Sequence, residues 1–175
     1  MIKILVVILG LIIIMIATIG IAFILPNINK TYNLGETNMK IKIPYSYVET
    51  GDTSKTHIIN LYNSRDEIKI SATNLIEDFW SSGDTEARID EYLKVMSSAN
   101  YDSNMKNVKK EVIGTLENKV GRVEFELSNL NDTYKSITII PNEEIGNLVI
   151  EIIGTKEAID NNKNEIEKII NTISI

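Results

Sequence analysis

Leu148-Val-Ile-Glu-Ile-Ile153 is the stretch of sequence that decides the fold, because it is apolar at every position except Glu151. Such a run is typical of a strand buried on both faces, at the centre of a sheet. Gly154 and Thr155 follow directly and predict the start of a final helix. The buried stripe expected on this helix consists of isoleucines, at positions 159, 166, 169, 170 and 173.

The residues before this run predict three further strands joined by tight connections. The strands are expected at residues 108–116, 120–127 and 134–140, separated by the turn-forming residues 117–119 and 129–132. In the middle strand apolar and charged residues alternate. A shift of its pairing by one residue would bury its charged side chains, so its register should be tightly set. These side chains are Arg122, Glu124 and Glu126.

The earlier part of the domain predicts three strands and one helix. Alternating residues 38–43 form a half-buried strand that Pro44 ends, and residues 57–62 and 67–76 form two more. The helix starts at Asp84 or Thr85, either of which can cap it. Its apolar stripe has helical spacing and comprises Ile89, Tyr92, Leu93 and Met96.

The order of predicted elements is therefore three strands, a helix, four strands and a helix, with short connections. This order indicates an α+β fold with an antiparallel sheet of about six or seven strands covered by two helices. The domain is expected to span residues 38–175, and residues 27–37 read as a polar connector without periodicity.

An apolar segment precedes the connector. Residues 4–25 contain no charged residue, and a helix of this length spans about 33 Å, enough to cross a bilayer core of about 30 Å. Residues 1–26 are therefore predicted to be an N-terminal transmembrane helix, a single-pass anchor that associates the chain with the membrane. A cleaved secretory signal, which would release a secreted form, is the alternative, but its apolar core is usually shorter.

The orientation of this anchor does not follow from a count of positive charges. Lys3 precedes the span, whereas Lys30, Lys40 and Lys42 follow it. A long following domain translocates largely regardless of its charge, so we expect an extracytoplasmic domain at the cell membrane.

Composition narrows the classes of function. The residues after Pro26 carry 17 basic and 24 acidic side chains, a net charge of −7, which argues against nucleic acid as a partner. The chain has no Cys, which excludes disulfides, thiolate metal sites and a Cys nucleophile. Its one histidine, His57, cannot form a typical zinc site without further ligands. We therefore predict no catalytic residue, metal or cofactor.

The start and the end of the domain resemble a known family. Met39-Lys-Ile-Lys-Ile-Pro-Tyr-Ser-Tyr47 is similar to the strand, proline and aromatic residue that open PsbP-type domains, and Ile169-Ile-Asn-Thr-Ile-Ser-Ile175 is similar to their end. The resemblance covers about residues 38–175 and implies an α/β/α sandwich. This superfamily includes an extrinsic photosystem subunit and many membrane-tethered prokaryotic proteins of unknown role. The resemblance carries no catalytic motif to transfer, and it does not extend to the metal-retention role of the photosystem subunit.

Three groups of residues are candidates for function. Phe79 and Trp80 lie in an acidic loop and are candidate binding residues, because exposed aromatic side chains are common in interfaces, although the more ordinary role of such a pair is to seal the end of the core. The carboxylates Glu77, Asp78 and Asp84 could act in acid–base chemistry, although Asp84 is better placed to cap the helix. Asn131 begins an Asn-Asp-Thr glycosylation sequon.

The sequence thus predicts a single-pass membrane-anchored domain that binds or scaffolds an envelope protein partner without catalysis. A carboxylate-dependent envelope hydrolase built around Glu77 and Asp84 is the alternative. The polar sheet residues are expected to be solvated, or to form a mixed-charge surface for the partner. They are Lys40, Lys42, Glu67, Lys69, Arg122, Glu124 and Glu126.

Overall fold

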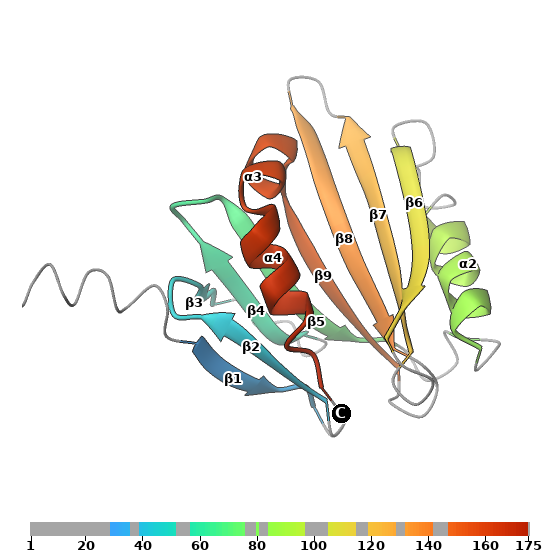
Figure 1. The fold of residues 1–175 in the computed structure, drawn as a ribbon, viewed down its shortest axis with the longest axis horizontal. Helices are drawn as coiled ribbons and strands as arrows, with labels where there is room; N and C mark the ends of the chain where they lie inside the picture. The colour runs from blue at the N-terminus through green and yellow to red at the C-terminus, as the bar shows by residue number, and fades with distance from the viewer. Residues whose placement is uncertain are drawn as a thin grey trace, which may run out of the picture.

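Strand β9 (Leu148–Thr155) lies at the centre of a seven-stranded sheet (Figure 1). The computed structural model describes residues 29–35, 39–51, 57–75, 80, 84–96, 105–114, 119–128, 132–141 and 147–174. β9 pairs with β5 on one side and β8 on the other, and all pairings in this sheet are antiparallel. The predicted central strand and antiparallel α+β fold are therefore confirmed.

The strand order is β3-β4-β5-β9-β8-β7-β6. The bounds of the other strands in this sheet are β3 (Val48–Glu49), β4 (His57–Asn63), β5 (Ile68–Asn74), β6 (Met105–Ile113), β7 (Val120–Ser128) and β8 (Thr133–Pro141).

A separate hairpin precedes this sheet. It consists of β1 (Asn29–Asn33) and β2 (Lys40–Pro44), which pair in antiparallel register from Asn29 opposite Pro44 to Asn33 opposite Lys40. Strand β1 therefore lies within residues 27–37, which the sequence predicts to be a polar connector. This strand is exposed along most of its length and held by backbone pairing, so it lacks the apolar alternation on which the prediction relied. The predicted strand at residues 38–43 exists, but it belongs to this hairpin and not to the large sheet.

Helix α2 (Thr85–Met96) begins where the sequence predicts. The backbone N–H of Ala87 donates to Asp84 Oδ2 at 3.1 Å, so Asp84 caps the helix. The predicted final helix is instead two helices, α3 (Lys156–Asn161) and α4 (Lys163–Ile170). The break is at Asn162, whose side-chain amide donates to the Ala158 carbonyl and ends α3.

The helices cover both faces of the sheet, which makes three layers (Figure 1). Two neighbouring residues of β7 show this, because successive side chains of a strand point to opposite faces. A Cβ added at Gly121 would lie 2.6 Å from the Ile89 side chain on α2, whereas Arg122 bonds to Glu167 on α4. The α/β/α arrangement implied by the family resemblance is therefore present.

The core is divided between the two faces. The larger cluster fills the space between the sheet, the β1–β2 hairpin and the helices α3 and α4, and it contains all the fully buried residues of β9. The smaller one lies beneath α2 and comprises Ile89, Tyr92, Val123, Phe125, Ile140 and Val149.

The last residues tie the hairpin to α4. Lys40 and Ser174 exchange two backbone hydrogen bonds of 2.8 and 3.0 Å, and the Lys42 N–H donates to Thr172 Oγ1 at 2.8 Å. The hairpin is thus fixed against the end of α4, and the space between them forms the pocket described below.

The predicted membrane anchor at residues 4–25 lies outside the described residues. Among the residues that the structure does describe, none of the helices has the length and apolar character needed to span a bilayer.

Candidate functional site

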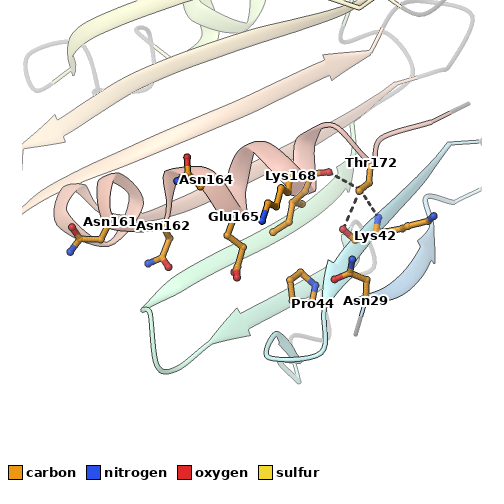
Figure 2. Close-up of a pocket in the computed structure, with 10 residues that line it drawn as sticks. Asn29, Lys42, Pro44, Asn161, Asn162, Asn164, Glu165, Lys168 and Thr172 are labelled. Atoms are coloured by element: carbon orange, nitrogen blue, oxygen red, sulfur yellow. Dashed lines mark hydrogen bonds between the residues drawn. The ribbon is translucent and has the colours of Figure 1, made fainter. Parts of the chain in front are cut away.

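A polar pocket of about 360 Å³ lies between the β1–β2 hairpin and helix α4 (Figure 2). We call it the β2–α4 pocket. One wall is formed by the hairpin and the other by α3, α4 and the residues after them. Its lining comprises Asn29, Lys42, Pro44, Asn161, Asn162, Asn164, Glu165, Lys168, Ile169 and Thr172.

Local structure explains why this pocket is polar. On β2 the buried Ile41 and Ile43 anchor the strand to the core, so the intervening Lys42 points outward. On the helical side Glu165, Lys168 and Thr172 follow at spacings of three and four residues, which places them on one side of the chain. The pocket therefore brings together residues about 130 positions apart, as the bond between Lys42 and Thr172 shows.

The charges in the pocket are incompletely paired. Within the described part of the chain neither the Lys42 nor the Lys168 ammonium group forms an ion pair. Glu165 Oε1 and the Tyr47 hydroxyl are both buried and lie close to each other. Burial raises the pKa of Tyr47, and Glu165 raises this pKa further through its charge and as an acceptor for the phenol, so the phenol stays protonated.

This arrangement can bind a small polar molecule. The described residues of the lining offer ammonium and amide donors, amide oxygens, a threonine hydroxyl and one carboxylate. Such groups can hold a small polar ligand that has both an anionic centre and hydrogen-bond donors.

A second charged cluster lies between β7 and the helices on the same face. Arg122 is 8% exposed, and its guanidinium donates two hydrogen bonds to the Glu167 carboxylate, at 3.0 and 2.6 Å. It also forms an ion pair with Glu124. The hydrogen bond from Arg122 lowers the pKa of Glu167, in spite of an opposing effect of burial.

Neighbouring ion pairs extend this cluster towards α3. Lys156 bonds to Asp160 at 2.7 Å and to Glu126 at 3.0 Å, and Lys135 bonds to Asp160 at 3.2 Å. The expectation that Arg122, Glu124 and Glu126 are solvated or face a partner is therefore wrong. They are paired within the chain, and they join the sheet to its covering helices.

The sequence-predicted candidates are not brought together into one site. Trp80 is partly buried against the cluster under α2, and the Arg88 guanidinium lies 5.3 Å from the centre of its ring. Asp84 caps α2. Phe79, Glu77, Asp78 and the sequon residue Asn131 lie outside the described residues, as does the side chain of His57. In the described part of the chain no group of His, Asp and Glu is arranged to hold a metal ion.

The position of Trp80 makes its substitution informative. Trp80→Ala should lower the free energy of unfolding by about 2 kcal/mol, because it removes apolar contacts with the cluster under α2 and the stacking partner of Arg88. Chemical denaturation followed by circular dichroism measures this change. Trp80→Phe is the control and should retain most of the stability. Unchanged stability of Trp80→Ala combined with lost partner capture would instead support the predicted binding role.

The residues of the β2–α4 pocket were not predicted as a site. A weak signal was present, since three asparagines fall within residues 161–164, where a helix would favour other residues. The other wall comes from residues 29–44, and only the tertiary structure brings the two segments together.

Comparison with solved structures identifies the class of fold. The chain is similar to the cyanobacterial PsbP protein of Synechocystis, with a TM-score of 0.53 and 11% identity over 84% of this chain and 92% of that one. It is also similar to the Ran-binding protein Mog1p of Saccharomyces cerevisiae, with a TM-score of 0.58 and 11% identity over 85% and 95% of the two chains.

A third similar structure is a Pseudomonas aeruginosa protein of unknown function described as a putative regulator, with a TM-score of 0.50 and 9% identity over 84% of this chain and 96% of that one. No protein-family model matches the chain, and no curated protein matches it in sequence. The domain therefore has the PsbP-type fold that the resemblance predicted, and the structure of Mog1p is similar to it as well.

Proposed function

We propose that this protein is a single-pass membrane-anchored domain that binds or scaffolds a partner protein on the extracytoplasmic side, without catalysis. Three observations support the proposal. Residues 4–25 are uninterrupted by charge and long enough to cross a bilayer. The fold is that of PsbP and of Mog1p, and the latter is a Ran-binding protein. The sheet also presents apolar side chains at one edge.

The proposal rests mainly on a row of side chains that runs across the sheet from the edge strand β3 to the central strand β9. Val48 on β3 lies opposite Tyr62 on β4, Tyr62 lies opposite Lys69 on β5, and Lys69 lies opposite Ile153 on β9. We call these four residues the β3–β9 row. They share the face on which α2 lies, but α2 packs against β6, β7 and β8, at the other end of the sheet.

The exposure of this row fits a protein partner. Val48 is 65% exposed and Tyr62 is 38% exposed, and both are large apolar side chains. Tyrosine beside an aliphatic side chain is common in the cores of protein interfaces, where it combines a large contact area with a polar group. Lys69 adds a cation that a partner carboxylate can pair with.

A charge placed in the row should prevent partner binding. In native membranes treated with a cross-linker, Val48→Glu should reduce the yield of the cross-linked partner at least about tenfold, because an unpaired carboxylate would be buried in the interface. Val108→Glu is the matched control, since Val108 is an exposed valine on the opposite edge strand. Equal yields from the two variants would contradict the assignment of this face.

The anchor and its orientation need a separate experiment. The full chain should remain in the membrane pellet after alkaline extraction, and added protease should digest the domain in intact cells stripped of their wall. A protected domain would contradict the outside-facing orientation, and release of a form lacking the first residues would favour the cleaved signal. A domain displayed by a cell with N-glycosylation would also make Asn131 a substrate for that modification.

A further inference from the structure

We propose that strand β6 pairs with β6 of a second copy of this chain, so that two sheets join into one. The two strands would run antiparallel about a two-fold axis that passes next to Lys110. The inference is independent of the partner proposed above, because β8 and β7 separate the β3–β9 row from β6. Three observations support it, namely the open edge at β6, the apolar side chains on one face of this strand and the charges on its other face.

The edge of the sheet at β6 is open. β6 is the last strand of the sheet, and among the described strands its only neighbour is β7 (Figure 1). Every residue from Lys106 to Val112 is exposed. The bulge of β6 lies at Asn107, whose φ is 54°, and residues 109–113 run in regular register with β7. The backbone groups on the outer side of such an edge strand can pair with another strand.

Pairing about Lys110 brings apolar side chains together on the face that α2 covers. Val112 lies opposite Gly121, where an added Cβ would meet Ile89 of α2, so Val112 is on this face. Val108 shares the face, because it lies an even number of residues away along the strand. The two valines are 37% and 45% exposed. In the proposed pair Val108 of each copy lies opposite Val112 of the other, and such β-branched pairs stabilise antiparallel strands.

The same register brings opposite charges together on the other face. Lys109 of each copy lies opposite Glu111 of the other. Within the described part of the chain Lys109 forms no ion pair, and Glu111 pairs only with Arg122, at 3.6 Å. The two Lys110 side chains lie opposite each other at the axis, but each ammonium group bonds to Asp90 of its own copy at 2.7 Å, which compensates its charge.

Neighbouring registers lack this match. An axis next to Lys109 would place the two Lys109 side chains opposite each other and Val108 opposite Lys110. An axis next to Glu111 would place the two Glu111 side chains opposite each other and Val112 opposite Lys110. Like charges directly opposite each other destabilise a pair of strands. The charges of β6 therefore favour pairing about Lys110 over pairing one residue to either side.

The test reverses these charges in the full chain and measures self-association in detergent by analytical ultracentrifugation. Lys109→Glu and Glu111→Lys should each weaken the wild-type self-association at least about tenfold, because each creates two pairs of like charges. An equimolar mixture of the two variants should associate as the wild type does, since residue 109 of each copy then faces the opposite charge at residue 111 of the other. A change within one chain cannot produce this recovery on mixing.

Lys106→Glu is the charge-matched control. Lys106 is exposed on the same strand, but it lies outside residues 108–112, so its reversal should leave self-association nearly unchanged. Circular dichroism should show that all three variants keep their fold. An equal loss for Lys106→Glu and Lys109→Glu, or a mixture that does not recover, would overturn the proposed register. A wild type that stays monomeric at every concentration would overturn the proposal, and the lysines would then act to keep the edge unpaired.

Introduced thiols test the register directly, because the chain has no Cys of its own. A mixture of Val108→Cys and Val112→Cys chains should form a disulfide-linked dimer under mild oxidation, since residues directly opposite each other have Cβ atoms about 5 Å apart. Val108→Cys alone should form little, because its two thiols would lie four residues apart along the strands, at least about 13 Å. Equal yields from the single variant and the mixture would overturn the pairing about Lys110.

Discussion

Arg122→Met should lower the free energy of unfolding by about 3 kcal/mol at pH 7, because it removes the cation that Glu124 and Glu167 share and leaves Glu124 with only its longer ion pair to Lys135 among the described residues. The Arg122 side chain is 10% exposed, and those of Glu124 and Glu167 are 16% and 33% exposed. Removing one partner from a buried group of charges lowers the free energy of unfolding by more than the whole group contributes to it, because the remaining charges stay partly buried without a partner. Urea denaturation of wild type and variant measures the difference.

The loss of stability caused by Arg122→Met should depend on pH. Arg122 holds the pKa of Glu167 below its ordinary value, so the stabilisation from this pair is fully present above the pKa that Glu167 has in the unfolded chain. It disappears as the pH falls through the lowered pKa of the folded state. The difference between wild type and Arg122→Met should therefore shrink below a pH of about 4.

The control for this experiment is an exposed arginine. The Arg65 side chain is 83% exposed and, among the residues that the structure describes, pairs only with Asp66 next to it, so Arg65→Met should change stability by less than about 0.5 kcal/mol. A loss for Arg122→Met that is as small as that for Arg65→Met, or one that stays constant from pH 7 to pH 3, would contradict the role assigned to Arg122.

Gly121→Ala should also destabilise the fold strongly, by about 2 kcal/mol. A Cβ at this position would lie 2.6 and 2.9 Å from two carbons of the Ile89 side chain, and Ile89 is only 2% exposed. α2 would have to move away from β7, or Ile89 would have to leave its rotamer. Thermal and urea denaturation measure the loss.

Two further variants test the cause of this loss. Gly51→Ala is the matched control, because in the described part of the chain no atom beyond the neighbouring residues lies within 4 Å of an added Cβ there, and it should leave stability almost unchanged. In an Ile89→Ala background the added methyl group has space, so Gly121→Ala should cost little there. Additive losses in the double variant would show that the contact between Gly121 and Ile89 is not the cause.

The parts of the fold that the sequence predicted are those with strong local signals. The apolar run from Leu148 to Ile153 is the central strand, and Asp84 caps α2. The alternation in β7 also sets its register correctly, with Val123 and Phe125 under α2. In each case the burial pattern or the capping chemistry depends on neighbours in sequence.

The parts that were missed depend on distant partners. β1 is exposed and exists because it pairs with β2, and the two-residue strand β3 is too short to show a pattern. The charged side chains of β7 are predicted from the sequence to be solvated, but α4 packs over them and Glu167 of α4 accepts a hydrogen bond from Arg122. The β2–α4 pocket escaped prediction for the same reason, since its walls come from opposite ends of the chain.

The tie between Lys40 and Ser174 has a consequence for the timing of folding. The hairpin is made early during synthesis, but its contacts with Thr172 and Ser174 require residues that leave the ribosome about 130 residues later. Contacts of such large sequence separation slow folding, because a long loop must close before they form. The β1–β2 hairpin therefore cannot form these contacts until the domain is almost fully synthesised. A partner or chaperone acting during this interval would encounter the apolar residues of β2 before α4 covers them.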